Sequence, residues 1–179
     1  MSKKKIVITG GPGTGKSSII HNLEAQGNEC LHEISRQVTL EAQKEGIAQL
    51  FLEKPLLFSE KLLEGRIRQH YEAEEKTIEP IFIDRGIPDV IAYMDYFETR
   101  YTSKFTEACE RHSYHQVFIL PPWKEIYKSD NERYETFEEA LAISKFLNET
   151  YKRFGYQPVE VPKGPVEERA NFILNNLDD

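Results

Sequence analysis

Short apolar runs alternate with longer amphipathic stretches along the chain. Four amphipathic stretches repeat apolar residues at helical spacing and are predicted to be helices over residues 16–26, 56–77 and 136–154 and from Pro165 onward. Parallel strands joined by crossover helices produce this alternation. The runs predicted to be strands are residues 5–9, 29–33, 80–84, 116–120 and 158–162. The pattern therefore predicts one α/β domain over residues 1–179.

Turn and capping residues mark the ends of these helices. Gly27 and Gly155 follow the first and third helices as stop signals, and Thr136 and Glu139 have the spacing of a capping box. In the third helix we expect the buried side to carry Phe137, Ala140, Leu141, Leu147, Tyr151 and Phe154. In the last helix we expect it to carry Val166, Ala170, Ile173, Leu174 and Leu177.

Composition narrows the class of protein. Hydrophobic residues make up 39% and charged residues 30%, which is a globular balance, and no apolar run is long enough to span a bilayer. Acidic residues outnumber basic ones 30 to 23, for a net charge of -7, so no nucleic-acid partner is expected. Nothing in the sequence reports an oligomeric state.

The N-terminus and the cysteines bear on the compartment. The start is basic, but the apolar run that follows covers only residues 6–8, so no export signal is predicted. Cys30 and Cys109 lack the spacing of a disulfide framework or a zinc site. A reducing, cytoplasmic location fits both observations.

A glycine-rich motif follows the first predicted strand directly. Residues 10–17 read Gly-Gly-Pro-Gly-Thr-Gly-Lys-Ser, which satisfies G-x-x-x-x-G-K-[ST], and a helix pattern begins at once. Backbone N–H groups in such a loop point at phosphate oxygens, and the helix N-terminus favours negative charge there. Lys16 would contact the β and γ phosphates and Ser17 the Mg²⁺. The predicted nucleotide-binding residues are Gly11, Gly13, Thr14, Gly15, Lys16, Ser17 and Ser18.

Charged residues end two more predicted strands, on the edge of the sheet that carries the glycine-rich loop. Glu33 could accept a proton from an attacking hydroxyl, and Arg36 could orient the acceptor. Asp84 occupies the position of a carboxylate that holds Mg²⁺, and Arg85 next to it is a candidate for catalysis and substrate binding. Ordinary ion pairs at strand ends are the alternative for both sites.

A basic segment precedes the Thr136 helix. Residues 122–135 contain Lys124, Lys128 and Arg133 and could close over ATP as a lid, with Arg133 the best catalytic candidate. The alternative is a solvated loop. The loop of residues 162–165 could touch the nucleotide base or serve only as a tight turn.

Several other residues receive a structural interpretation. We expect Arg66 and Arg68 to be exposed arginines of the long middle helix, although either could reach an acceptor, and His32 to be a packed or surface histidine. Five aromatic residues could line an acceptor pocket, but most are expected in the core: Phe51, Phe58, Tyr93, Tyr96 and Phe97.

With these motifs in their order, nearly the whole chain resembles the AAA-domain-like P-loop family that includes the NadR-type ribosylnicotinamide kinase domain and a fly protein needed for channel translocation. More distantly it is similar to deoxynucleoside and nucleoside monophosphate kinases. The resemblance implies a three-layer fold with a five-stranded parallel sheet in the order 2-3-1-4-5. It also implies Glu33 as the base and Asp84 with Arg85 as an acid–arginine pair. Gly86 departs from that pattern, because those kinases usually carry serine there.

Two hypotheses follow. In the first, the protein is a kinase that transfers the γ-phosphoryl group of Mg-ATP to a hydroxyl or phosphate of a small, nucleoside-like or other acceptor, with Mg²⁺ on Ser17 and Asp84. In the second, it is a nucleotide-dependent module that binds ATP or GTP and engages a protein or an anionic lipid. The guanine-reading NKxD signature is missing, which disfavours a GTPase switch.

Overall fold

The computed structural model describes residues 2–127 and 135–179. Its sheet has five parallel strands in the order β2-β3-β1-β4-β5, as predicted. Strand β1 is central, and its last residue is followed directly by the glycine-rich loop. The strands are β1 (Lys5–Gly10), β2 (Glu29–Leu31), β3 (Ile81–Asp84), β4 (Gln116–Leu120) and β5 (Val159–Glu160).

Eight helices lie within the described residues. The four predicted ones appear with boundaries shifted by at most two residues, and the capping box of Thr136 and Glu139 is present at the start of α7. Helices α2, α3, α5 and α6 were not predicted from the sequence. The helices are α1 (Lys16–Ala25), α2 (Ser35–Lys44), α3 (Leu50–Glu53), α4 (Pro55–Glu75), α5 (Ile87–Tyr96), α6 (Ser103–Arg111), α7 (Phe137–Arg153) and α8 (Val166–Asn175).

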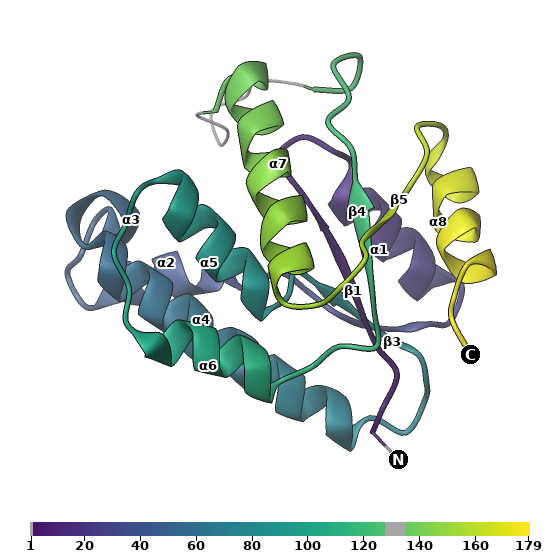
Figure 1. Cartoon of the computed structure of the whole chain (residues 1–179), viewed down its shortest axis with the longest axis horizontal. Coiled ribbons are helices and arrows are strands. Elements are labelled where there is room, and N and C mark those ends of the chain that lie inside the picture. Colours follow the sequence, from purple (N-terminus) through teal and green to yellow (C-terminus); the bar gives the residue numbers. More distant parts are fainter. Residues whose placement is uncertain (1, 128–134) are drawn as a thin grey trace.

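The helices cover both faces of the sheet (Figure 1). Successive side chains of a strand point to opposite faces, so Ile6 and Ile8 of β1 pack with α1 and α8. Val7 between them packs in the other core, which α4, α5 and α6 help to build. All three side chains are fully buried. This three-layer arrangement presents the carboxyl ends of β1, β2 and β3 together at one edge.

Two predicted core positions were wrong. Leu141 is 47% exposed, because the buried side of α7 runs through Ala140, Ile143 and Leu147, and Leu141 projects away from it. Val166 is 38% exposed at the first residue of α8, one turn before the first buried apolar residue, Ala170.

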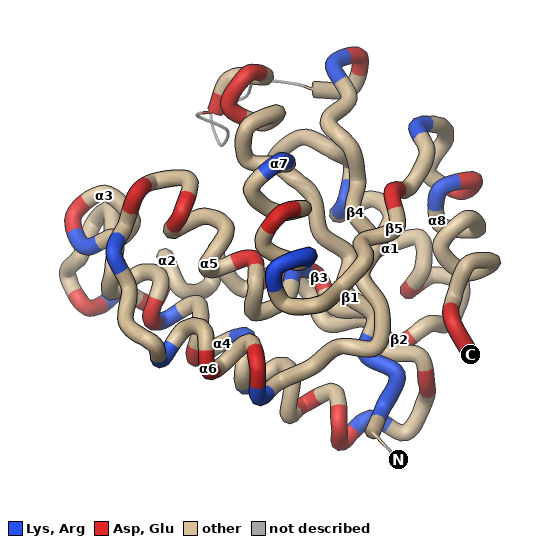
Figure 2. Tube along the Cα trace, in the orientation of Figure 1, with Lys and Arg blue, Asp and Glu red and all other residues tan. Residues whose placement is uncertain are grey.

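Surface charges of both signs are mixed. Figure 2 shows basic and acidic positions interleaved along α4, α7 and α8. Among the described residues, no helix is both long enough and apolar enough to cross a membrane. Cys30 and Cys109 are buried and free, and burial raises the pKa of each thiol to about 12.

Candidate functional site

The glycine-rich loop connects β1 to α1 and lines one end of a cavity of about 500 Å³. All of the predicted nucleotide-binding residues, Gly11 to Ser18, lie along this cavity. Gly13 and Gly15 have φ of 71° and 82°, in the left-handed region where a Cβ is disfavoured. The loop is also tied internally, because the Thr14 hydroxyl donates to the Gly11 carbonyl at 3.1 Å. The geometry is that of a phosphate-binding loop at a helix N-terminus.

Lys16 and Asp84 form a buried ion pair beside this loop. Nζ of Lys16 donates to Oδ1 of Asp84, and the two side chains are 9% and 3% exposed. Burial lowers the pKa of Lys16, as does the positive charge of Arg85, while Asp84 and Glu33 oppose this shift. The start of α1 and the end of β3 thus bring together the lysine and the carboxylate that the motifs predicted for a nucleotide and its Mg²⁺.

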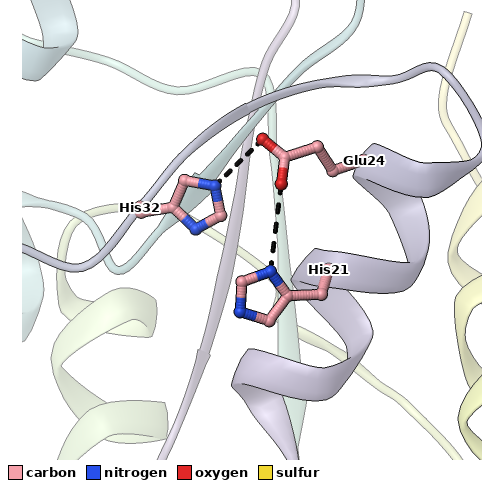
Figure 3. Close-up of side chains that lie close together, drawn as sticks. All are labelled: His21, Glu24 and His32. Atoms are coloured by element: carbon pink, nitrogen blue, oxygen red, sulfur yellow. Dashed lines mark hydrogen bonds and ion pairs between the residues drawn. The ribbon is translucent and has the colours of Figure 1, made fainter.

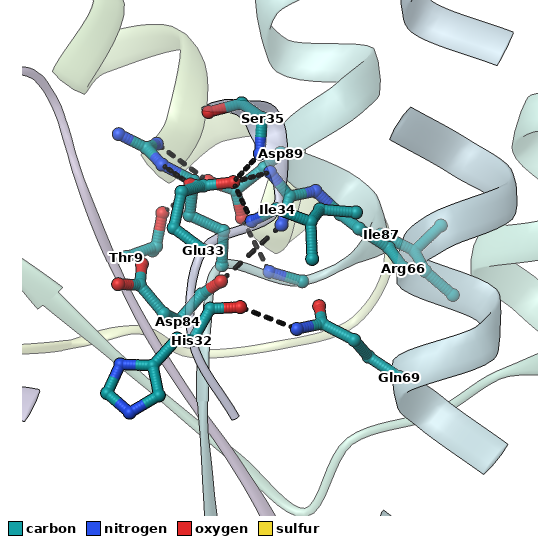
Figure 4. A network of polar contacts seen from close by, with 12 residues as sticks. Thr9, His32, Glu33, Ile34, Ser35, Arg66, Gln69, Asp84, Ile87 and Asp89 are labelled. Carbon is teal, nitrogen blue, oxygen red and sulfur yellow. Dashed lines mark hydrogen bonds and ion pairs between the residues drawn. The ribbon is translucent and has the colours of Figure 1, made fainter. Parts of the chain in front are cut away.

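Glu33, which lines the cavity, stands at the centre of a network of charged side chains (Figure 4). Its Oε1 accepts from Nη2 of Arg66 at 2.9 Å, and its Oε2 from Nε of Arg85 at 2.8 Å. The backbone N–H groups of Ile34 and Ser35 also donate to Oε1, at 2.9 and 3.0 Å. Burial disfavours the charged form, but Arg66, Arg85 and Lys16 outweigh it and hold the pKa of Glu33 far below its usual range. Glu33 is therefore a fixed, ionised carboxylate.

Arg66 corrects the sequence analysis. It was expected to be an exposed helix arginine, but only 3% of its side chain is accessible. Besides the pair with Glu33, its Nη1 donates to the Asp84 carbonyl oxygen at 3.4 Å. Arg68, two residues along α4, is exposed as expected. A two-residue step on a helix turns about 200°, so the two arginines lie on opposite sides of α4.

Asp89 is a site residue that the sequence reasoning missed. It lies in the first turn of α5, is fully buried, and accepts from Arg85 at 3.1 Å and from the Thr9 hydroxyl at 2.6 Å. The backbone N–H of Gly86 and the hydroxyl of Tyr151 donate to its other oxygen. Its position four residues after Arg85, where a new helix starts, is the signal that could have identified it.

Tight packing explains the glycine after Arg85. A Cβ placed on Gly86 would lie 2.7 Å from the Tyr151 hydroxyl oxygen and 3.0 Å from Cε2 of Tyr114. Both tyrosine hydroxyls also accept hydrogen bonds from this turn. The backbone N–H of Gly86 donates to Tyr151, and that of Ile87 donates to Tyr114. The departure from serine at this position therefore follows from the two tyrosines that fill the space.

Aromatic side chains form the other end of the cavity, where most had been expected in the core. Phe51, Phe58, Tyr93 and Phe97 line it, together with Leu62 and Met94. Phe51 packs edge-on against Phe58 and Phe97, with ring centroids 5.6 and 5.0 Å apart. Phe51 and Phe97 remain 38% and 44% exposed, so this apolar wall faces the cavity. Tyr96, the fifth aromatic residue, is not among the lining residues.

The remaining predicted site residues are Arg36 and the residues of the proposed lid. Arg36 is an exposed residue of α2 and is not among those lining the cavity, so its role in substrate binding stays a prediction. The lid candidates Lys128 and Arg133 lie outside the described residues. Lys124 is exposed, and Glu135, at the end of the same segment, lines the cavity.

Arg169 of α8 supports the phosphate loop from behind. Only 2% of it is exposed, and its guanidinium donates to the carbonyl oxygens of Thr14 at 2.9 Å and Pro162 at 3.1 Å. Trp123 lies over it, with 5.5 Å between Cζ and the ring centroid. The sequence analysis did not single out Arg169, because a single arginine in a helix gives no short motif.

Solved structures with the same fold include kinases of several substrates. Deoxyadenosine kinase from M. mycoides, with dCMP and dCDP bound, has a TM-score of 0.67 and 19% identity, covering 96% of this chain and 97% of that one. Thymidylate kinase from Candida albicans has a TM-score of 0.67 and 15% identity, covering 97% of this chain and 90% of that one.

The NadR protein in complex with NR has a TM-score of 0.73 and 14% identity over 97% of this chain, which spans 49% of the NadR chain. No curated protein matches the sequence. Residues 5–169 match the AAA domain family, and the chain therefore belongs to that family of P-loop proteins with a kinase-like fold.

Proposed function

We propose that the protein is a kinase that transfers the γ-phosphoryl group of Mg-ATP to a hydroxyl group of a small, ring-containing acceptor. One observation carries the proposal: a single cavity joins the phosphate loop to Glu33 and continues to the aromatic wall. A nucleotide phosphate on the loop and a ring against Phe51 and Phe97 would place the acceptor hydroxyl beside Glu33. Phosphoryl transfer depends mainly on such positioning and on charge stabilisation.

The charge balance of the cavity favours a hydroxyl over a phosphate as the accepting group. Among the described lining residues of the acceptor end, the cations are Arg66 and Arg85, and each is already paired with Glu33 or Asp89. Glu135 adds a further negative charge. An acceptor phosphate needs cations in excess, since burying its charges unpaired is costly. A neutral alcohol needs only one hydrogen-bond acceptor, which Glu33 supplies.

The residues present suit Mg²⁺. The Ser17 hydroxyl and the Asp84 carboxylate are hard oxygen donors of the kind that Mg²⁺ prefers. Softer metals would instead be selected by sulfur or imidazole ligands, and neither of these two side chains supplies one. When bound with ATP, the ion would neutralise charge on the β and γ phosphates. Lys16, which now pairs with Asp84, would contact the same phosphates.

Glu33 receives the proton in this mechanism. The acceptor oxygen forms a bond to the γ-phosphorus while the bond from that phosphorus to the β–γ bridging oxygen breaks, leaving ADP and a phosphoester. Because the pKa of Glu33 is held low, it is a weak base before transfer, and its first role is to orient the hydroxyl. The proton moves to it as the hydroxyl oxygen acquires its bond to phosphorus.

Phosphorus NMR tests the proposal directly. Purified protein is incubated with Mg-ATP, or with Mg-GTP in a parallel arm, and a pool of nucleosides, ribosylnicotinamide, sugar and vitamin alcohols, and nucleoside monophosphates. We expect a new phosphoester resonance from an alcohol, absent in Lys16→Ala. Glu33→Gln should reduce its rate by about 10²-fold or more while ATP affinity stays nearly unchanged. Glu41→Gln, an exposed carboxylate of α2, is the matched control.

Other outcomes would change the conclusion. A diphosphate resonance made from a monophosphate would contradict the argument from charge balance. Tight nucleotide binding with no transfer to any acceptor in the pool would contradict the kinase and favour the nucleotide-dependent binding module.

A further inference from the structure

Two histidines and a glutamate gather at the surface between α1 and the segment that follows β2, and none of them lines the cavity (Figure 3). His21 and Glu24 are one turn apart on α1, and His32 follows the end of β2. One ligand atom from each, two imidazole nitrogens and a carboxylate oxygen, lie within 4.8 Å of one another. None of the three has a role in the phosphate site, and this cluster is independent of the proposed function.

The spacing of these atoms matches the needs of a small transition-metal ion. Two ligand atoms about 2.1 Å from a tetrahedral ion lie about 3.4 Å apart. Nε2 of His32 lies 3.0 Å from Oε1 of Glu24, and Nδ1 of His21 lies 3.8 Å from Oε2 of Glu24. These two distances fall on either side of the ideal value, so small side-chain rotations would suffice to bring the donors around one ion.

The framework behind the three side chains is fixed. His21 and Glu24 are three residues apart on α1, so their side chains lie on one side of the helix. The third residue is held from the other side, because Nε2 of Gln69 donates to the His32 carbonyl oxygen at 2.6 Å. The side chains of His21, Glu24 and His32 are 68%, 49% and 45% exposed, so an ion can enter and keep water in its remaining position.

We propose that His21, Glu24 and His32 form a binding site for one divalent transition-metal ion of the Zn²⁺ class. Two imidazoles and one carboxylate suit Zn²⁺, Co²⁺, Ni²⁺ and Cu²⁺ and disfavour Mg²⁺ and Ca²⁺, which take oxygen ligands. The ion would join α1, which begins in the phosphate loop, to the segment that carries Glu33. It would thereby clamp two elements that meet at the catalytic cavity.

Calorimetric titration of Zn²⁺ into tag-free, chelator-treated protein tests this site, with excess Mg²⁺ present and nucleotide absent. We expect one equivalent to bind to the wild-type chain. Loss of an outer partner of a metal ligand already costs about 10–100-fold in affinity, so His21→Ala and His32→Ala should each weaken binding at least about tenfold. His115→Ala, another exposed histidine, should bind Zn²⁺ as the wild type does.

Thermal unfolding gives a second readout. A ligand of the folded state raises Tm with increasing concentration, so Zn²⁺ should raise the Tm of the wild type and of His115→Ala but not of a His21→Ala, His32→Ala double variant. Because all three side chains are exposed, these variants should fold, which circular dichroism checks. No binding to the wild type, or equal binding to the double variant, would overturn the proposal.

Discussion

The Nε atom of Arg85 lies 2.8 Å from Oε2 of Glu33, and Arg85 reaches it from a backbone with φ of 70°. A residue other than glycine in this left-handed region costs about 1–3 kcal/mol and persists only where its surroundings hold it. Glu33 and Asp89 both hold the Arg85 guanidinium, from the segment that follows β2 and from α5. The strained residue therefore joins two elements around the place where we expect the acceptor hydroxyl.

Replacing Arg66 should destabilise the protein far more than replacing Arg68. Arg66→Met leaves the partly buried Glu33 carboxylate with one arginine instead of two. Breaking a buried ion pair from one side typically costs about 3–5 kcal/mol. Arg68→Met changes only an exposed side chain of the same helix and should stay within about 0.5 kcal/mol. Urea unfolding of both variants measures the difference, and equal stabilities would contradict the buried network.

The ion pairs of Glu33 should contribute to the free energy of unfolding down to acidic pH. Its pKa in the folded protein lies below the ordinary value of 4.5, so the folded state holds the ionised form more strongly than the unfolded chain does. The stabilisation is therefore complete above the unfolded pKa and is lost as the pH falls through the folded pKa.

Urea unfolding of the wild type and of Glu33→Gln over a range of pH measures the contribution of the Glu33 ion pairs. The difference in unfolding free energy between them should be constant near neutral pH and shrink only below pH 4.5. A difference that already decreases between about pH 7 and 5 would mean that the pKa of Glu33 is raised instead.

Gly86→Ser should lower stability through a steric clash with Tyr151. The added Cβ would lie 2.7 Å from the tyrosine hydroxyl oxygen, a separation that requires the backbone or the ring to move. Overpacking of this kind typically costs about 1–3 kcal/mol. Tyr151→Phe removes the clashing oxygen, so the double variant should be more stable than the sum of the two single effects predicts. Simple additivity would rule out this contact as the cause.

The strands and the phosphate loop could be predicted from the residues themselves because their signals are local, whereas the order of the strands was implied only by the resemblance to a known family. An apolar run, a glycine-rich turn and a helix pattern lie next to one another at residues 5–26. Helices α2 and α5 were missed because the corresponding signals are not local. Their buried sides are completed by residues far away in the chain, and in α5 nearly every residue is buried, which removes the amphipathic pattern.

The roles of Arg66 and Asp89 could not be predicted from the pattern of neighbouring residues in the sequence. Arg66 lies in the long, charged α4, where an arginine is ordinarily exposed, and only the pairing of β2 with β3 places Glu33 against it. The aromatic wall was misassigned to the core because apolar side chains that line a cavity have the same sequence pattern as buried ones. Tertiary packing decides between these cases, and a single sequence does not report it.

Replacing Arg169 should weaken nucleotide binding although its side chain lies behind the phosphate loop. Its guanidinium fixes the Thr14 carbonyl, and an ideal Cβ on Gly15 would lie 3.1 Å from its Nη1, so loop and arginine are in close contact. Arg169→Met should raise the Kd for Mg-ATP about tenfold, the equivalent of one lost charge-assisted hydrogen bond of about 1.4 kcal/mol. Lys104→Met, which changes an exposed lysine of α6 outside the cavity lining, should leave the Kd unchanged. Fluorescence of Trp123, the single tryptophan and a neighbour of Arg169, follows the titration in both variants. If Arg169→Met binds Mg-ATP as tightly as Lys104→Met while remaining folded, the loop holds its shape without this support.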